Sequence, residues 1–187
     1  MRIISGKHRG KQLHPPHNLP VRPTTDFARV GLFNILNNLV DFEELRVLDL
    51  FAGTGSISFE FISRGSKEVI ALDNSHQCTQ FIEKMATELR TASLVALCMD
   101  AFQYLERTSD SFDLVFADPP YNMEGIDQIP DLVFKNNLLK ENGLFILEHS
   151  KRHEFSAHPR FSQRRNYGNV HFSFFRLQPP SPALPPP

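Results

Sequence analysis

Tryptophan is absent from this chain of 187 residues, and cysteine is scarce, with two residues. The longest apolar run spans six residues, 94–99, whereas a membrane-spanning helix needs about 20, so we expect no membrane span. The first residues lack the apolar stretch of a signal peptide. Cys78 and Cys98 are too few for a metal cluster or a disulfide framework, and no other residues have metal-ligand spacing. These absences predict a cytoplasmic protein that binds no metal.

The chain as a whole also has no strong excess of positive or negative charge, since its formal net charge is −1. The charges are nevertheless unevenly distributed. Residues 1–30 and 151–187 each carry six Lys or Arg and one acid, whereas residues 31–150 carry eight basic and 19 acidic residues. Two basic ends are typical of a protein that binds a polyanion. The alternative is a solvated surface whose charge happens to be uneven.

Short apolar runs alternate with helical stretches over most of the chain, and this predicts βαβ units with a parallel sheet. The runs are nearly continuous, so we expect helices on both faces of the sheet. Two later extended segments, with Gly168 in a turn between them, predict a C-terminal antiparallel hairpin. The fold class is therefore α/β, with a mostly parallel, doubly wound sheet of seven strands. The strands are expected at 46–51, 68–72, 94–99, 112–117, 144–148, 160–166 and 170–177, and helices at 57–63, 77–90 and 102–107.

The two ends of the chain differ from this pattern. Residues 1–14 contain Gly6 and Gly10 and predict a β-ribbon within a basic extension, residues 1–25. A helix then begins at Thr25 or Asp26 and runs to about Asn38. Its expected buried stripe consists of Phe27, Val30, Phe33, Leu36 and Leu39. Residues 179–187 hold six of the 14 prolines and predict an extended tail outside a single domain, residues 1–178.

A glycine-containing turn follows the first apolar strand at Gly53-Thr54-Gly55. Such turns let the backbone approach a ligand, and the next helix offers free N–H groups there. Asp73 ends the second strand, where a carboxylate accepts hydrogen bonds from ribose hydroxyls. A dinucleotide fits less well, because Ser58 replaces the third glycine and Asp49 would repel a pyrophosphate but attract an ammonium group. A dinucleotide-binding oxidoreductase therefore stays the weaker alternative.

Asp100 follows the third strand and has two interpretations that the sequence does not separate. Its carboxylate is placed to accept a hydrogen bond from an adenine amino group. Alternatively, it caps the helix that follows.

The most specific motif is Asp118-Pro119-Pro120-Tyr121, directly after the strand at 112–117. The two prolines fix the loop, so that the Asp118 carboxylate and the Pro119 carbonyl both accept from one NH₂ group. This arrangement would localise the nitrogen lone pair and offset the charge that develops on nitrogen. The Tyr121 ring offers a face on which a flipped base stacks. The alternative is a rigid turn that only closes the strand.

These motifs resemble those of class I S-adenosylmethionine-dependent amino-methyltransferases. The N-terminal Arg2-Ile-Ile-Ser-Gly-Lys-His-Arg-Gly-Lys-Gln-Leu and the later Arg22-Pro-Thr-Thr-Asp26 resemble the RsmD family of 16S rRNA (guanine-N2)-methyltransferases over residues 1–177. The resemblance implies a Rossmann-like class I methyltransferase fold. It also implies S-adenosylmethionine as cofactor and 16S rRNA or the small ribosomal subunit as partner.

The resemblance also implies roles for individual residues. Asp118 to Tyr121 would be catalytic, and Thr24 and Thr25 would close the cofactor pocket. The other implied cofactor-binding residues are Asp49, Phe51, Gly53, Thr54, Gly55, Asp73, Asn74, Asp100 and Ala101, and the candidate RNA-binding residues are Arg2, Lys7, Arg9, Lys11, Arg22 and Arg29. At Phe27 the sequence departs from the family, whose members usually carry a basic residue there.

Two further alternatives remain open at this point. The tetrad does not name the base, so a DNA adenine-N6 methyltransferase would use the same chemistry. A binding module with an inactive site is the third possibility. A DNA enzyme of this type usually carries a separate target-recognition domain, for which 187 residues leave no room, so the DNA hypothesis is the weaker one. We expect a monomer.

Overall fold

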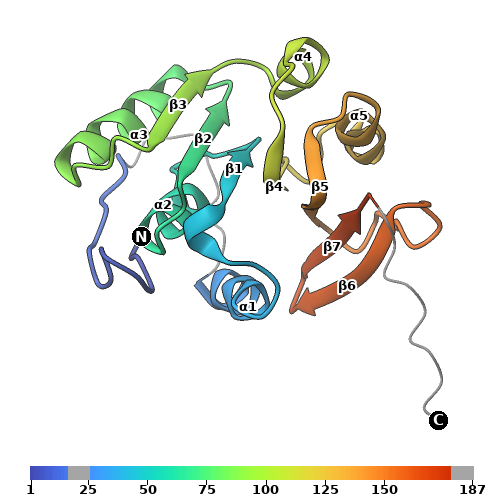
Figure 1. Cartoon of the computed structure of the whole chain (residues 1–187), viewed down its shortest axis with the longest axis horizontal. Coiled ribbons are helices and arrows are strands. Elements are labelled where there is room, and N and C mark those ends of the chain that lie inside the picture. Colours follow the sequence, from blue (N-terminus) through green and yellow to red (C-terminus); the bar gives the residue numbers. More distant parts are fainter. Residues whose placement is uncertain (17–25, 178–187) are drawn as a thin grey trace.

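The computed structural model describes residues 1–16 and 26–177. Within them, seven strands form one sheet in the order β3-β2-β1-β4-β5-β7-β6 (Figure 1). The first five strands in that order are parallel, whereas β7 pairs antiparallel with both β5 and β6. The expected mostly parallel sheet with an antiparallel C-terminal pair is confirmed. The strands are β1 Arg46–Asp49, β2 Glu68–Asp73, β3 Leu94–Cys98, β4 Phe112–Ala117, β5 Leu139–His149, β6 Phe161–Tyr167 and β7 Val170–Arg176.

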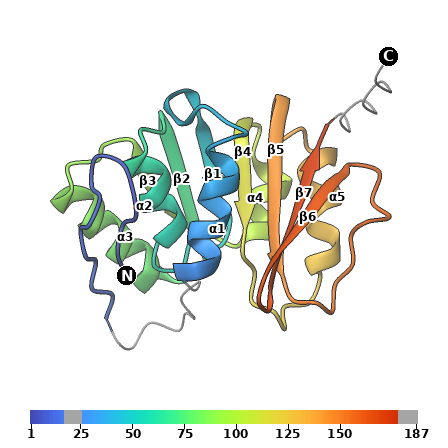
Figure 2. The ribbon, with the colours of Figure 1, turned by 90° about the horizontal axis from the view of Figure 1, so that it is seen from below.

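Helices cover both faces of the sheet, as the nearly continuous apolar strands predict. Figure 2 shows α1, α2 and α3 in front of the sheet and α4 and α5 behind it. Each face has its own apolar cluster: Leu32 and Phe59 pack with Val47 on one side, and Leu105 and Val133 belong to the cluster on the other. The helices are α1 Asp26–Leu36, α2 Ser56–Ser63, α3 His76–Glu88, α4 Ala101–Arg107 and α5 Ile129–Lys135, with short 3₁₀ turns η1 Phe42–Glu44 and η2 Ile126–Gln128.

The buried face of α1 differs from the predicted stripe. Residues four apart, Ala28, Leu32 and Leu36, are fully buried, whereas Phe27 is 69% exposed and Val30 37%. The reason is geometric: residues three apart turn by about 300° around an α-helix, so a run spaced by three drifts around the helix rather than following one face. The predicted stripe is therefore wrong at Phe27, Val30 and Leu39, and α1 ends at Leu36 rather than near Asn38.

The N-terminal ribbon forms a hairpin with less regular pairing than predicted. Its one isolated bridge joins Arg2 to Gln12, and the Ile3 and Leu13 side chains are buried against the α1–α3 side of the core. Gly6 lies against the backbone of α2 with φ 79°, and a Cβ there would come within 1.8 Å of the Ser63 carbonyl oxygen. The hairpin is therefore packed closely onto the domain.

α5 is not among the helices that the sequence predicts. Pro130 lies in its first turn, where the missing N–H costs no hydrogen bond. The helix buries Ile129 and Val133 against the sheet. Across residues 1–16 and 26–177, every helix is too short or too polar to be a membrane-spanning segment. The expectations for Arg22, Thr24, Thr25 and the tail 179–187 concern residues outside the described ranges.

Candidate active site

A cleft of about 1220 Å³ opens beyond the carboxyl ends of β1 and β4. The chain runs from β1 outward to β3 and then returns to β4 on the other side of β1. Parallel α/β sheets bind ligands at such a reversal of strand order. Among the residues expected to bind the cofactor or the base, the cleft is lined by Asp49, Phe51, Gly53, Thr54, Asp73, Asn74, Asp100, Ala101 and all four residues from Asp118 to Tyr121.

The glycine turn and Asp73 hold one another in place. The Gly53 amide donates to Asp73 Oδ2 at 2.8 Å, and the Ser75 amide donates to Oδ1 at 2.8 Å. Gly55 caps α2 with φ 75°, a conformation that favours glycine. Gly55 lies behind the cleft lining, where a Cβ would meet Phe59 and Ile82. Gly55 therefore shapes the loop rather than contacting the cleft.

Asp49 is a buried carboxyl group at the bottom of this cleft, with 1% exposure. Its Oδ2 accepts a hydrogen bond from the Ser58 hydroxyl at 2.6 Å, so Ser58 has a role that a third glycine would not supply. Oδ1 is buried without a hydrogen-bond partner among the described residues. Burial raises the pKa of Asp49 to about 7, and the nearby charges of Asp118 and Asp73 act in the same direction. An orphaned buried oxygen surrounded by carboxylates suits a cationic donor such as an ammonium group.

The Asp118–Tyr121 loop leaves β4 at the next strand end. Asp118 is half-buried and Pro119 is buried, and the Met123 amide closes the turn by donating to the Pro120 carbonyl at 2.8 Å. The Tyr121 hydroxyl donates to Glu148 Oε1 at 3.1 Å. The loop is therefore anchored to β5 through a side chain as well as through its prolines.

Glu148 is the principal site residue that the sequence reasoning missed. It lies near the end of β5, lines the cleft and is 2% exposed. Burial and the charge of Asp118 raise its pKa to about 9. One signal was available: Glu148 ends the predicted strand 144–148, just as Asp49 and Asp73 stand at the ends of theirs.

The two interpretations of Asp100 prove compatible. Its Oδ1 accepts from the Gln103 amide at 3.0 Å, which makes it the N-cap of α4. It also lines the cleft together with Ala101 and is exposed there. A carboxylate has further lone pairs after one capping bond, so capping leaves room for a ligand.

Aromatic and basic side chains also line the cleft. The rings of Phe27 and Tyr167 meet edge to face with centroids 5.7 Å apart, and both residues line the cleft. Lys151 and Arg152 line the same cleft and are exposed. The sequence analysis assigned no site role to these four residues, because α1 and the C-terminal segments are far apart in the chain.

The candidate RNA-binding residues fall into two groups in the structure. Arg2, Lys7, Arg9 and Lys11 are exposed on the N-terminal hairpin. Arg29, in contrast, is 1% exposed. Its guanidinium Nη2 donates to the Arg2 carbonyl oxygen at 2.6 Å and to Asp26 Oδ1 at 2.8 Å. The expectation of an RNA contact at Arg29 is therefore corrected, since this side chain joins the hairpin to α1 inside the protein.

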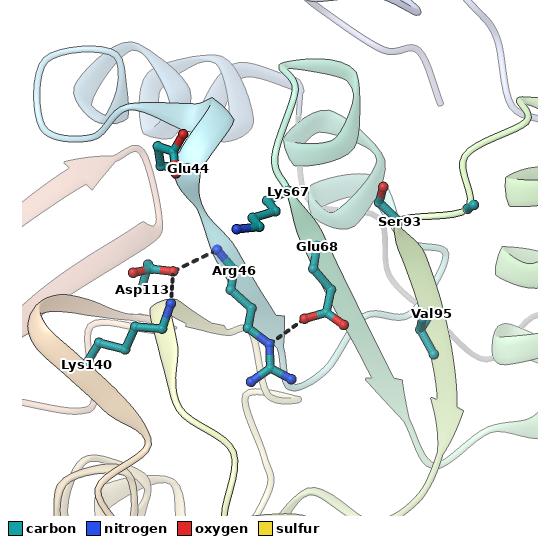
Figure 3. Close-up of a pocket in the computed structure, with 9 residues that line it drawn as sticks. Glu44, Arg46, Lys67, Glu68, Ser93, Val95, Asp113 and Lys140 are labelled. Carbon is teal, nitrogen blue, oxygen red and sulfur yellow. Dashed lines mark hydrogen bonds and ion pairs between the residues drawn. The ribbon is translucent and has the colours of Figure 1, made fainter.

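A second hollow, of about 550 Å³, lies at the opposite end of the strands, where β1 and β2 begin (Figure 3). Four of its charged side chains form ion pairs. Arg46 pairs with Glu68, and Lys140 Nζ lies 2.7 Å from Asp113 Oδ2, which also accepts from the Arg46 amide at 2.9 Å. Among the described residues, none that lines this hollow has a buried carboxyl oxygen without a partner, in contrast to Asp49.

Comparison with known proteins agrees with this geometry. A family described as conserved hypothetical protein 95 matches residues 1–176. The chain is 34% identical over 155 residues to ribosomal RNA small subunit methyltransferase D of Haemophilus influenzae, covering 81% of this chain and 79% of the relative. It is 30% identical over 161 residues to the putative rRNA methyltransferase YlbH of Bacillus subtilis, covering 82% and 85%.

The fold has a close counterpart among solved structures. The putative methyltransferase yhhF from Escherichia coli superposes with a TM-score of 0.84 at 26% identity, over 95% of this chain and 99% of that one. The Rossmann-like methyltransferase fold expected from the motifs is therefore confirmed.

Proposed function

Because the chain belongs to the family described as conserved hypothetical protein 95, whose named relatives include rRNA methyltransferases, we propose that it methylates the exocyclic amine (N2) of a guanine in 16S rRNA. The methyl donor in this proposal is S-adenosylmethionine. One observation carries the proposal. Asp49, suited to a cationic ligand, and the Asp118–Tyr121 loop, suited to an amine-bearing base, line one cleft at adjacent strand ends.

The cofactor side of the cleft is negatively charged. S-adenosylmethionine, when bound, supplies an electrophilic methyl group on a cationic sulfur and also carries an ammonium group. Asp49 would accept from that ammonium through its unpartnered Oδ1. Asp73 would accept from the ribose hydroxyls with the lone pairs that Gly53 and Ser75 leave free. A dinucleotide fits poorly, because its pyrophosphate would lie next to these carboxylates.

The base side would orient the nucleophile. The Asp118 carboxylate and the Pro119 carbonyl would both accept from the guanine amine, while the Tyr121 ring stacks on the base. The N2–methyl bond would form as the methyl–sulfur bond breaks with its electron pair left on sulfur, and the amine proton would pass to water in the open cleft. The Asp118 charge stabilises the positive charge that appears on N2 along this path.

RNA would reach the cleft across basic surfaces on two sides. The backbone of Arg2 lies near the cleft, because Arg29 donates both to the Arg2 carbonyl oxygen and to that of Ser56, which lines the cleft. Lys151 and Arg152 line the cleft from the C-terminal part of the chain. These side chains supply sequence-independent attraction for phosphates, and the base contacts supply selection. We propose small-subunit rRNA, free or assembled, as the partner of a monomeric protein in the cytoplasm.

The test is methyl transfer in vitro. Purified protein is incubated with tritiated S-adenosylmethionine and with small subunits, or their free rRNA, that lack the modification. The nucleosides are then separated after digestion. We expect label in N2-methylguanosine, and none with the Asp118→Ala variant. Label in N6-methyladenine of added DNA, or tight binding of NAD with no methyl transfer, would contradict the proposal.

A further inference from the structure

A buried carboxyl group lies directly beside Asp118 and has no part in the mechanism described so far. β4 and β5 are parallel neighbours in which Ala117 pairs with Leu147. The next residues of the two chain segments, Asp118 and Glu148, therefore lie side by side. Paired residues of neighbouring strands project to the same face. Glu148 is 2% exposed although it lines the cleft.

The contacts of Glu148 join it to both functional side chains of the loop. Its Oε1 accepts from the Tyr121 hydroxyl at 3.1 Å, and its carboxyl group is hydrogen-bonded to that of Asp118. Glu148 Oε2 is buried and has no donor among the described residues. On the other side, Glu148 pairs across the sheet with Phe172, which is apolar.

Two carboxyl groups in contact away from water cannot both be ionised near neutral pH, so one proton is shared between them. Burial decides which group keeps it. Glu148 is nearly inaccessible, whereas Asp118 is half-buried and faces the cleft. The charged form therefore costs more at Glu148, in agreement with the rise of its pKa to about 9. Asp49, from β1, is a further negative group that acts on Asp118.

Building on the function proposed above, we propose that Glu148 is a positioning residue that remains a neutral acid, donates a hydrogen bond to Asp118 and accepts one from Tyr121. One side chain would then fix both the group that accepts the base amine and the ring on which the base stacks. Asp118 would keep its negative charge, and its remaining lone pairs would face the cleft.

Substitutions separate this role from a purely structural one. Glutamine has the shape of a neutral glutamic acid, with an NH₂ that donates to Asp118 and an oxygen that accepts from Tyr121. Glu148→Gln should therefore keep kcat within about threefold of wild type. Glu148→Ala removes both hydrogen bonds and should lower kcat by about 10- to 100-fold, because small misplacements of reacting groups are costly. Cofactor affinity should stay nearly unchanged in both variants.

The pH profile gives a second readout. The wild-type rate should fall at alkaline pH as Glu148 loses its proton, since two adjacent charges would then repel each other. Glu148→Gln has no such proton and should lack this part of the decline. Titration of the RNA or the cofactor affects both proteins equally, so the difference between the two profiles reports on Glu148.

The experiment is steady-state methyl transfer to unmodified small subunits from pH 6 to pH 10 with wild type, Glu148→Gln and Glu148→Ala, with folding checked by circular dichroism. The inference would be overturned if Glu148→Gln lowers kcat as much as Glu148→Ala does, or if Glu148→Ala is as active as wild type. It would also be overturned if the rate of Glu148→Gln declines at alkaline pH in the same way as the wild-type rate. If Glu148→Ala does not fold, the kcat of Glu148→Gln and the two pH profiles still test the role of Glu148. A wild type that transfers no methyl group to any nucleic acid would instead reject the proposed function.

Discussion

Asp49 occupies a position at which ionisation costs stability, because its carboxyl group is buried and Oδ1 has no hydrogen-bond partner among the described residues. Its pKa is raised to about 7 from the ordinary value of 3.8. A folded-state pKa above the unfolded one means that the folded protein holds its proton longer, so stability falls as pH rises from about 4 to about 7. The unliganded protein favours the protonated form of Asp49. A bound ammonium group would instead favour the ionised form.

Cofactor binding should therefore depend on the ionisation of Asp49. The Kd for S-adenosylhomocysteine, measured calorimetrically, should fall by about eightfold from pH 6 to pH 7.5, because binding to a protonated Asp49 must first release a proton. Asp49→Asn should bind more weakly, with little pH dependence. It should also be more stable than wild type at pH 8 by about 4 kcal/mol, because the pKa of Asp49 rises from 3.8 to about 7 on folding, but not at pH 4. A pH-independent Kd in the wild type would contradict this assignment.

Asp118 is expected to act mainly in the transition state. Asp118→Ala should lower turnover by at least about 10²–10³-fold, while the Kd of the cofactor changes by less than about threefold. Asp118→Asn keeps an acceptor oxygen but loses the charge, so its turnover should lie between those of Ala and wild type. Tritiated methyl transfer measures these rates. A folded Asp118→Ala protein with nearly wild-type turnover would show that the loop is only a turn.

At the scale of elements, Glu60 of α2 holds the N-terminal hairpin to the domain. This fully buried carboxylate accepts from the Ile4 amide at 2.8 Å and from the Ser5 amide at 3.1 Å, and it pairs with Arg64 at 2.8 Å. A buried anion is stable when its partners satisfy it in this way. Ser63 and Arg29 also bind the hairpin, since the Lys7 amide donates to the Ser63 carbonyl and Arg29 donates to the Arg2 carbonyl, so Glu60 supplies one part of its attachment.

Removing this carboxylate should loosen the hairpin near Ile4 and Ser5. Glu60→Ala should lower the free energy of unfolding by about 2–4 kcal/mol, because the Ile4 and Ser5 amides and Arg64 lose their acceptor. Hydrogen exchange at those two amides should accelerate more than exchange in β4. Glu83→Ala, at an exposed position on α3, is the matched control and should change neither quantity. Unchanged amide protection in Glu60→Ala would contradict this account.

How far the sequence predicts the fold differs between elements. The strands of the sheet were predicted to within about two residues in most cases, because buried parallel strands are continuous apolar runs. α5 was missed, because its seven residues are too few to show a helical period, although Pro130 in the first turn is typical of a helix start. In the site, Asp49, Asp73 and Asp118 could be found because each marks a strand end. Phe27 and Tyr167 could not, because only tertiary packing brings α1 and β6 together.

At the scale of the whole molecule, the two basic ends and the acidic middle of the sequence occupy different parts of the structure. The carboxylates Asp49, Asp73 and Asp118 line the cleft at the strand ends, and Lys151 and Arg152 line it from the C-terminal part of the chain. Further basic side chains are exposed on the N-terminal hairpin. This arrangement would let a polyanion bind beside a site that prefers a cationic cofactor.

Neutralising Lys7, Arg9 and Lys11 together should weaken RNA binding and leave cofactor affinity unchanged. Each lost phosphate contact should reduce the slope of log K against log salt by about 0.7–0.9. Neutralising the exposed residues Lys84, Arg90 and Arg107 removes the same charge elsewhere and is the matched control. A wild-type salt slope in the hairpin variant would show that this surface is only solvated.

The proposed reaction is tested most directly by mass mapping of methylated guanines in small-subunit rRNA from cells with and without this protein. We predict that one N2-methylguanine is lost in its absence, that the wild-type protein restores it and that Asp118→Ala does not. Identical guanine methylation in both strains would contradict the proposed function.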